Sequence, residues 1–115
     1  MPWSWSLAGI GAKSPMPELP ELNPVIHGKL RLALLSLLAG VEKAEFTWLR
    51  AKTGSTDGNL GAQLLKLEEA GYVAAEKKFV ARKPQTIYRI TENGRQALTE
   101  YVQALKQLLG SAITA

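Results

Sequence analysis

The sequence predicts a single small α+β domain, mainly α-helical with one β-hairpin, in the order helix, helix, helix, strand, strand, helix. Apolar residues recur at helical spacing in four separate stretches. Two runs rich in β-branched and aromatic residues follow one another within residues 72–90. The length of 115 residues, of which 46 % are apolar, fits one modest core. We therefore expect an irregular N-terminal tail over residues 1–21, one domain over 22–110 and a C-terminal tail over 111–115.

The N-terminal tail has little periodicity and carries Pro2, Pro15, Pro17 and Pro20. Its two tryptophans, Trp3 and Trp5, either pack on the body or on a second subunit, or belong to a disordered segment. No basic residue precedes Lys13, which argues against a secretory signal. The longest apolar stretch, residues 32–41, is far shorter than the roughly 20 residues that span a bilayer. The sequence thus predicts a cytoplasmic protein that does not enter a membrane.

The first helix is predicted to begin with Asn23 as its cap and Pro24 at its first helical position. Helical spacing continues to about Ala39, and Gly40 can supply the left-handed residue that ends a helix. The apolar residues that recur at this spacing are Ile26, Leu30, Ala33, Leu34 and Leu37.

Two further helices follow closely. A short second helix over residues 44–53 ends near Gly54, and Ser55 or Thr56 caps a third helix that Gly71 stops. The residues predicted to face the core are Phe46 and Leu49 in the second helix, and Leu60, Leu64, Leu67 and Ala70 in the third.

The polar face of the third helix suits DNA. In a helix-turn-helix pair the second helix enters the major groove while the first braces it across the backbone. Asparagine and glutamine can each make two hydrogen bonds with adenine, lysine can reach guanine or phosphate, and a helix N-terminus can hold a phosphate. The candidate DNA contacts in this helix are Thr56, Gly58, Asn59, Gln63 and Lys66. The alternative is an ordinary amphipathic helix with a solvated polar face.

After Gly71 the runs 72–80 and 85–90 predict two strands joined by a loop. Residues 77–95 hold six basic residues and one acidic residue, Glu92, so their net charge of +5 exceeds the +4 of the whole chain. Localised positive charge favours contact with phosphates, although charge on a hairpin edge can also serve only to prevent aggregation. The candidate DNA contacts here are Lys77, Lys78, Arg82, Lys83, Gln85 and Arg89.

Thr91 is predicted to cap a last helix that carries a broad apolar stripe and ends at Gly110. Such a stripe suits a two-fold interface, formed by this helix alone or together with the first helix and the N-terminal tail. The candidate dimer contacts are Leu32, Leu35, Tyr101, Leu105 and Leu108.

Several functional classes are excluded by composition. The absence of cysteine excludes disulfides, zinc fingers and thiol redox sensing. His27 is the only histidine, and we interpret it as a surface or dimer-interface residue because nothing near it completes a metal or catalytic site. The sequence therefore predicts no catalytic residue, no metal ion and no cofactor, and hence no enzyme.

The most specific segment is TDGNLGAQLLKLEEAGYV, residues 56–73, followed by KKFVARKPQTIYRITENGRQAL. Over residues 22–106 the chain resembles the winged-helix transcriptional regulators related to the MarR and ArsR types. The resemblance implies a homodimer on double-stranded DNA, with a recognition helix over about 56–70 in the major groove and a wing over about 77–89 on the backbone or minor groove. In such proteins serine is frequent at the position of Gly61 and histidine at that of Gln63, so these two departures bear on base preference.

The main alternative is a winged helix used for protein assembly, with its positive charge serving an acidic partner. The polar outer face of the third helix offers few apolar groups for that purpose. Three alternatives are compatible with the sequence: a small organic molecule as effector, a protein as effector, or no effector. Trp48 and Tyr88 are interpreted as packing residues, with a pocket between subunits as the alternative.

Overall fold

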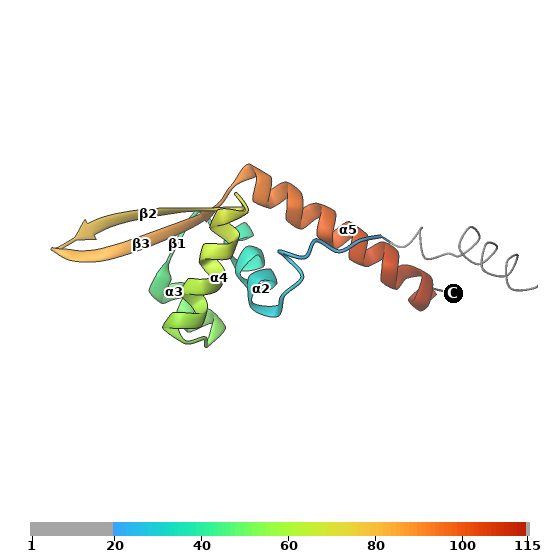
Figure 1. Cartoon of the computed structure of the whole chain (residues 1–115), viewed down its shortest axis with the longest axis horizontal. Coiled ribbons are helices and arrows are strands. Elements are labelled where there is room, and N and C mark those ends of the chain that lie inside the picture. The colour runs from blue at the N-terminus through green and yellow to red at the C-terminus, as the bar shows by residue number, and fades with distance from the viewer. Residues whose placement is uncertain (1–19, 115) are drawn as a thin grey trace, which may run out of the picture.

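The computed structural model describes residues 20–114, and the side chains as far as Gly110. In chain order the elements are α2 (Lys29–Ala39), β1 (Ala44–Glu45), α3 (Phe46–Thr53), α4 (Asp57–Glu69), β2 (Val73–Val80), β3 (Lys83–Ile90) and α5 (Glu92–Thr114). The predicted order of helices and hairpin strands is confirmed, with the additional strand β1 (Figure 1). The predicted roles of Trp3 and Trp5 lie outside the described residues.

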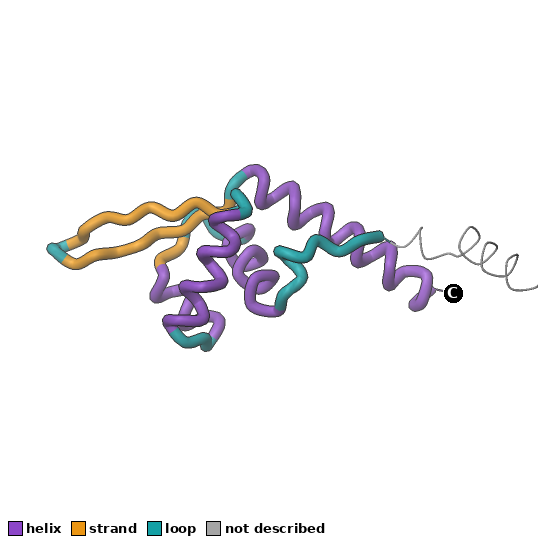
Figure 2. The backbone as a smooth tube through the Cα atoms, in the orientation of Figure 1, coloured by secondary structure: helices purple, strands orange, loops and turns teal. Residues whose placement is uncertain are grey.

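The core lies where three helices meet the base of the sheet and the first half of α5 (Figure 2). It is built from leucines of the helices, one pair of residues from the hairpin and two residues of α5. Its fully buried leucines are Leu34, Leu35 and Leu38 from α2, Leu49 from α3, and Leu60, Leu64 and Leu67 from α4. The core also includes Ile26 from the turn before α2, Ala44 from β1, Val73 and Ile90 from the hairpin, and Ala97 and Tyr101 from α5. From this body the hairpin extends in one direction and α5 in the other (Figure 1).

The first helix begins later than predicted. Asn23 does cap a turn, since its Oδ1 accepts hydrogen bonds from the backbone N–H of Val25 at 2.9 Å and of Ile26 at 3.4 Å. Gly28 then adopts an extended conformation (φ −153°, ψ 135°), and α2 starts at Lys29. The separate turn carries Ile26 into the core, where it has no exposed surface.

The sheet has the order β1-β3-β2, with both pairs antiparallel. Ala81 and Arg82 alone form the hairpin turn, with φ of 52° and 67°, so the predicted four-residue loop was too long. A two-residue turn with both residues left-handed matches the twist of the flanking strands. Lys83 and Pro84 belong to β3, and Pro84 is tolerated because β1 pairs only with Ile87 and Tyr88 and leaves that edge open.

The last helix, α5, runs to Thr114. The prediction that it ends at Gly110 was therefore wrong. A glycine inside a helix costs only about 1 kcal/mol relative to alanine, which does not end a helix by itself. Among the described residues, no helix is long and apolar enough to cross a membrane.

Candidate nucleic-acid interface

A tight connection holds α3 and α4 together as a helix-turn-helix pair. Gly54 ends α3 in the left-handed conformation (φ 67°), and its N–H donates to the carbonyl of Arg50. Of the two predicted caps, Thr56 is the one that caps α4, with its Oγ1 accepting from the N–H of Asn59 at 3.2 Å. An exposed ion pair joins the two helices, with 2.7 Å between Arg50 Nη1 and Asp57 Oδ1.

The two faces of α4 divide as the sequence predicts. Leu60, Leu64 and Leu67 are buried, while the candidates Thr56, Gly58, Asn59 and Lys66 are exposed. A Cβ built on Gly58 or Gly61 would meet nothing within 4 Å, so packing inside the domain does not require glycine at either position. Leu65, 53 % exposed, is an apolar residue on the surface of α4 that the sequence reasoning did not single out.

Gln63 is half-buried and does not project freely into solvent. Its Oε1 accepts a 2.6 Å hydrogen bond from Nη1 of Arg31 in α2, and its Nε2 donates to Oδ1 of Asn59 at 3.2 Å. Asn59 and Gln63 are therefore one hydrogen-bonded unit anchored on α2. Arg31 is a functional candidate that the sequence reasoning missed, because 32 positions separate it from Gln63.

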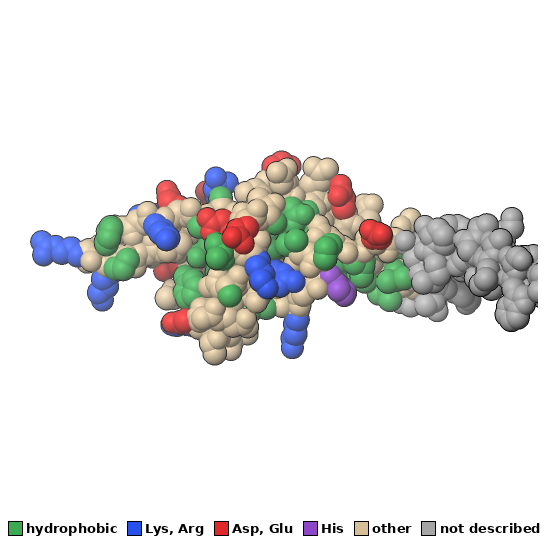
Figure 3. Space-filling view, in the orientation of Figure 1, with side chains coloured by type: hydrophobic (Ala, Val, Ile, Leu, Met, Phe, Trp, Pro, Cys, Tyr) green, Lys and Arg blue, Asp and Glu red, His purple; other side chains and the backbone are tan. Residues whose placement is uncertain are grey.

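The wing, defined here as the β2–β3 hairpin, carries the predicted basic residues on exposed positions. Lys77, Lys78, Arg82, Lys83 and Arg89 are all exposed, whereas Gln85 is half-buried. Basic side chains reach out from the far end of the wing, with apolar side chains beside them (Figure 3). Two apolar residues near this end of the wing, Phe79 and Val80, are 76 % and 49 % exposed. The sequence predicts a strand over these two residues but does not indicate that both side chains are exposed.

Strand alternation assigns the wing residues to two faces. Lys77 and Phe79 share one face with their cross-strand partners Thr86 and Pro84. Lys78 and Val80 share the other face with their partners Gln85 and Lys83. Each face of the tip therefore combines apolar area with positive charge.

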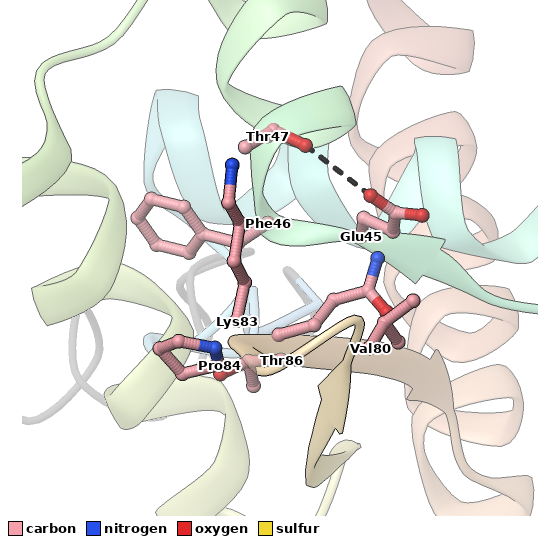
Figure 4. A pocket seen from close by; sticks show the side chains of 8 residues that line it. Glu45, Phe46, Thr47, Val80, Lys83, Pro84 and Thr86 are labelled. Atoms are coloured by element: carbon pink, nitrogen blue, oxygen red, sulfur yellow. Dashed lines mark hydrogen bonds between the residues drawn. The ribbon is translucent and has the colours of Figure 1, made fainter.

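A cleft of about 530 Å³ separates the base of α3 from the wing. Glu45, Phe46 and Thr47 line it on one side, and Val80, Lys83, Pro84, Gln85 and Thr86 on the other. In Figure 4 the side chain of Lys83 extends across this cleft toward Phe46 and Thr47. The positive charge of Lys83 is thus on the side of the wing that faces the helix-turn-helix pair.

The two aromatic residues considered as pocket residues have different surroundings. Tyr88 packs against the core, and burial together with the negative charge of Glu68 raises the pKa of its hydroxyl. Trp48 is 36 % exposed, and Lys52 Nζ lies 5.5 Å from the centroid of its ring.

Two of the predicted dimer contacts are corrected by their burial. Leu35 has no exposed surface and Tyr101 is only 4 % exposed, because both belong to the core of the single chain. Tyr101 also contacts the exposed His27, since 2.8 Å separates His27 Nδ1 from the tyrosine hydroxyl. Leu32, Leu105 and Leu108 are half-buried, and Val102 and Leu109 are exposed beside them. In the described part of the chain no group of three or more His, Cys, Asp or Glu residues could hold a metal ion.

Comparison with known proteins gives consistent matches. The family described as winged helix DNA-binding domain matches residues 30–109. An uncharacterized protein of Methanocaldococcus jannaschii is 39 % identical over 84 residues, which cover 73 % of this chain and 91 % of that protein. The solved structure of a transcriptional regulator homologue from Pyrococcus horikoshii OT3 has a TM-score of 0.72 at 26 % identity, covering 77 % of this chain and 88 % of that one. A structure described as a MarR-family transcriptional regulator, from Enterococcus faecalis V583, has a TM-score of 0.60 at 28 % identity and covers 78 % and 79 %. The family description names a DNA-binding domain and the two solved structures are described as transcriptional regulators, in agreement with the sequence-based resemblance.

Proposed function

The chain belongs to the winged helix DNA-binding domain family, and from this premise we propose that it is a homodimeric regulator of transcription that recognises specific double-stranded DNA sites. In this proposal α4 lies in the major groove and the wing contacts the DNA backbone or the minor groove. The observation that carries the proposal is the pairing of an exposed polar helix face on α4 with a wing whose exposed charged side chains are basic except for Glu76.

The exposed face of α4 is suited to close approach. Gly58 and Ala62 present little bulk, and Asn59 and Lys66 present polar groups to the outside. The N-terminus of α4 directs its backbone N–H groups outward, and one of them is already bonded by Thr56. A DNA phosphate near this end would interact with the remaining N–H groups and with the positive end of the helix dipole.

The wing supports the proposal through charge. Lys77, Lys78, Arg82 and Lys83 cluster at its tip, and no ion pair among the described residues neutralises any of them. Each lysine or arginine that meets a phosphate releases about one condensed counterion, which gives affinity and a steep dependence on salt. Phe79 adds an exposed aromatic ring between these charges, and apolar wing residues of this kind can pack on sugars or wedge between base steps in the minor groove.

An apolar stripe along α5 supports the dimer. Leu98, Val102, Leu105 and Leu109 follow one another at spacings of four, three and four, which is the pattern of a helix that packs along another helix. Val102 and Leu109 are 39 % and 45 % exposed in the single chain. Packing α5 against its symmetry mate would bury this stripe and place two wings and two α4 helices on one DNA face, with half-sites about 34 Å or a multiple apart.

The test is direct binding of the purified full chain to DNA. Labelled fragments of random sequence are titrated at low salt and followed by fluorescence anisotropy, and bound fragments from a random pool are then sequenced. We expect binding at or below about 10 µM at low salt, loss of affinity with added salt, and enrichment of a two-fold symmetric site. Absence of binding at tens of micromolar would overturn the proposal, and binding without enrichment would leave the protein a non-specific DNA binder. Binding to an acidic protein or peptide without binding to DNA would instead favour protein assembly.

A further inference from the structure

Arg31 is a half-buried arginine beside the exposed face of α4, and no carboxylate lies within ion-pair distance of it among the described residues. All its recorded partners are neutral oxygens. Nη1 donates to Gln63 Oε1 at 2.6 Å, Nη2 to the carbonyl of Pro24 at 3.3 Å, and Nε to the carbonyl of Val25. Because a guanidinium has five N–H donors and no acceptor, every one of these contacts has a fixed direction.

The donor-to-acceptor direction set by Arg31 also fixes the direction of the next hydrogen bonds along the surface of α4. The Oε1 atom of Gln63 faces Arg31, because only the oxygen can accept from a guanidinium. The Nε2 atom of Gln63 therefore faces Asn59 and donates to its Oδ1. Arg31, Gln63 and Asn59 thus form a hydrogen-bond relay, and its last group is the Nδ2 of Asn59, which has two N–H donors. The three side chains form a chain of donors that begins in α2 and ends at the exposed surface of α4.

Resting on the proposed function, we propose that Arg31 is a positioning residue that makes the reading face of α4 a hydrogen-bond donor surface, which selects guanine over adenine beneath Asn59 and Gln63. Pairing of an amide side chain with adenine uses the amide oxygen to accept from N6–H and the amide nitrogen to donate to N7. In this structure one lone pair of each amide oxygen is already used inside the protein, so only the second lone pair is left for adenine N6–H, and the direction in which it points is fixed. Guanine presents two acceptors, N7 and O6, at the same edge, and these match the outward N–H groups.

Gly28 gives independent support for a site shaped around Arg31. A Cβ built on Gly28 would lie 2.8 Å from Nη2 and 2.9 Å from Cζ of Arg31, so the absence of a side chain at this position makes room for the guanidinium. The backbone of Gly28 is extended (φ −153°), a conformation that alanine adopts without strain. Gly28→Ala should therefore displace the guanidinium from Gln63 while leaving every charge and every polar group of the chain in place.

The experiment compares the base preference of four full-length proteins. Bound fragments are selected from a random DNA pool with the wild type, Arg31→Met, Gly28→Ala and the matched control Arg50→Met, which also removes one positive charge next to α4 but lies outside the relay. We expect the wild type to require guanine at one position in each half-site. In Arg31→Met and Gly28→Ala the ratio of affinities for guanine and adenine at that position should fall about fivefold or more. Arg50→Met should weaken all sites without changing the ratio.

A second readout keeps the result independent of a folding defect. In two-dimensional amide spectra of the free proteins, the side-chain NH₂ resonances of Gln63 and Asn59 should shift in Arg31→Met and in Gly28→Ala but not in Arg50→Met. If Arg31→Met does not fold, Gly28→Ala decides the question. A wild type that binds with adenine at that position, or an unchanged ratio in the folded variants, overturns the role of Arg31 alone. A wild type that does not bind DNA overturns the proposed function itself.

Discussion

Gly94, in the first turn of α5, lies directly against the backbone carbonyl oxygen of Tyr72, so that a Cβ on Gly94 would collide with that oxygen and with Ile90. The same carbonyl accepts from the N–H of Thr91 at 2.9 Å, and Thr91 Oγ1 caps α5 by accepting from the N–H of Gly94 at 3.0 Å. The start of the wing and the start of α5 are thus locked together at one point. This contact sets the direction in which the wing and α5 leave the body.

We therefore expect Gly94→Ala to lower the free energy of unfolding by roughly 1–3 kcal/mol, because backbone must shift to admit the methyl group. Urea denaturation followed by circular dichroism measures the change. The matched control is Gly61→Ala, where the added Cβ has open space and alanine is the better helix former, so that its stability should rise by up to about 1 kcal/mol. Equal stability of the two variants would contradict the close contact at Gly94.

The turn of the wing gives a second prediction. Ala81 and Arg82 both have positive φ, and a left-handed conformation costs a non-glycine residue roughly 1–2 kcal/mol. Ala81→Gly should relieve part of this strain without changing charge, and amide hydrogen exchange at the wing tip should slow. Faster exchange at the tip would mean that the two-residue turn does not persist in solution.

Local signals in the sequence were sufficient for α4 and for the hairpin. Thr56 marks the cap of α4, and Leu60, Leu64 and Leu67 recur on one face, so the start and the buried side followed from neighbouring residues alone. The strand β1 was missed because two residues, Ala44 and Glu45, are too few to show a period, and they pair with residues more than forty positions away.

The sequence predicted which residue types make up the candidate site but not the hydrogen bonds between their side chains. The link between Arg31 and Gln63 depends on the packing of α2 on α4, which periodicity does not specify. Phe79 was expected to be an ordinary strand residue, yet the wing extends beyond the body and leaves its ring without a covering layer. Leu35 and Tyr101 were assigned to a dimer because apolar stripes do not reveal which side the core already occupies.

A third prediction concerns Gly58, which is exposed in the first turn of α4 and touches nothing that would require glycine. If its purpose is close approach to DNA, Gly58→Ala should increase stability by up to about 1 kcal/mol while weakening DNA binding. Gly61→Ala should give the same gain in stability with little change in affinity. Thermal melts and anisotropy titrations of both variants measure the two effects, and unimpaired binding by Gly58→Ala would remove that position from the interface.

A fourth prediction separates charge from apolar contact at the wing tip. Lys83→Ala should weaken binding to all sequences and reduce the slope of log K against log salt by about 0.9, the effect of one phosphate contact. Phe79→Ala should also weaken binding but should leave the slope unchanged, because no counterion release depends on the ring. Titrations at several salt concentrations distinguish the two, and a Phe79→Ala variant that binds like the wild type would show that the ring does not meet DNA.

The fifth prediction tests α5 as the dimer helix. Val102 is 39 % exposed in the single chain and lies in the stripe formed with Leu98, Leu105 and Leu109, so Val102→Glu would place a charge between the paired helices without entering the core. We expect this variant to sediment as a folded monomer and to lose at least tenfold in affinity for a two-half-site DNA, because each half-site would then bind independently. Gln103→Glu, which adds the same charge at the neighbouring exposed position, is the control and should remain dimeric. If Val102→Glu stays dimeric by analytical ultracentrifugation, the interface lies on another face. If the wild type itself sediments as a monomer, binding would have to proceed through single half-sites, and the selected DNA should then lack two-fold symmetry.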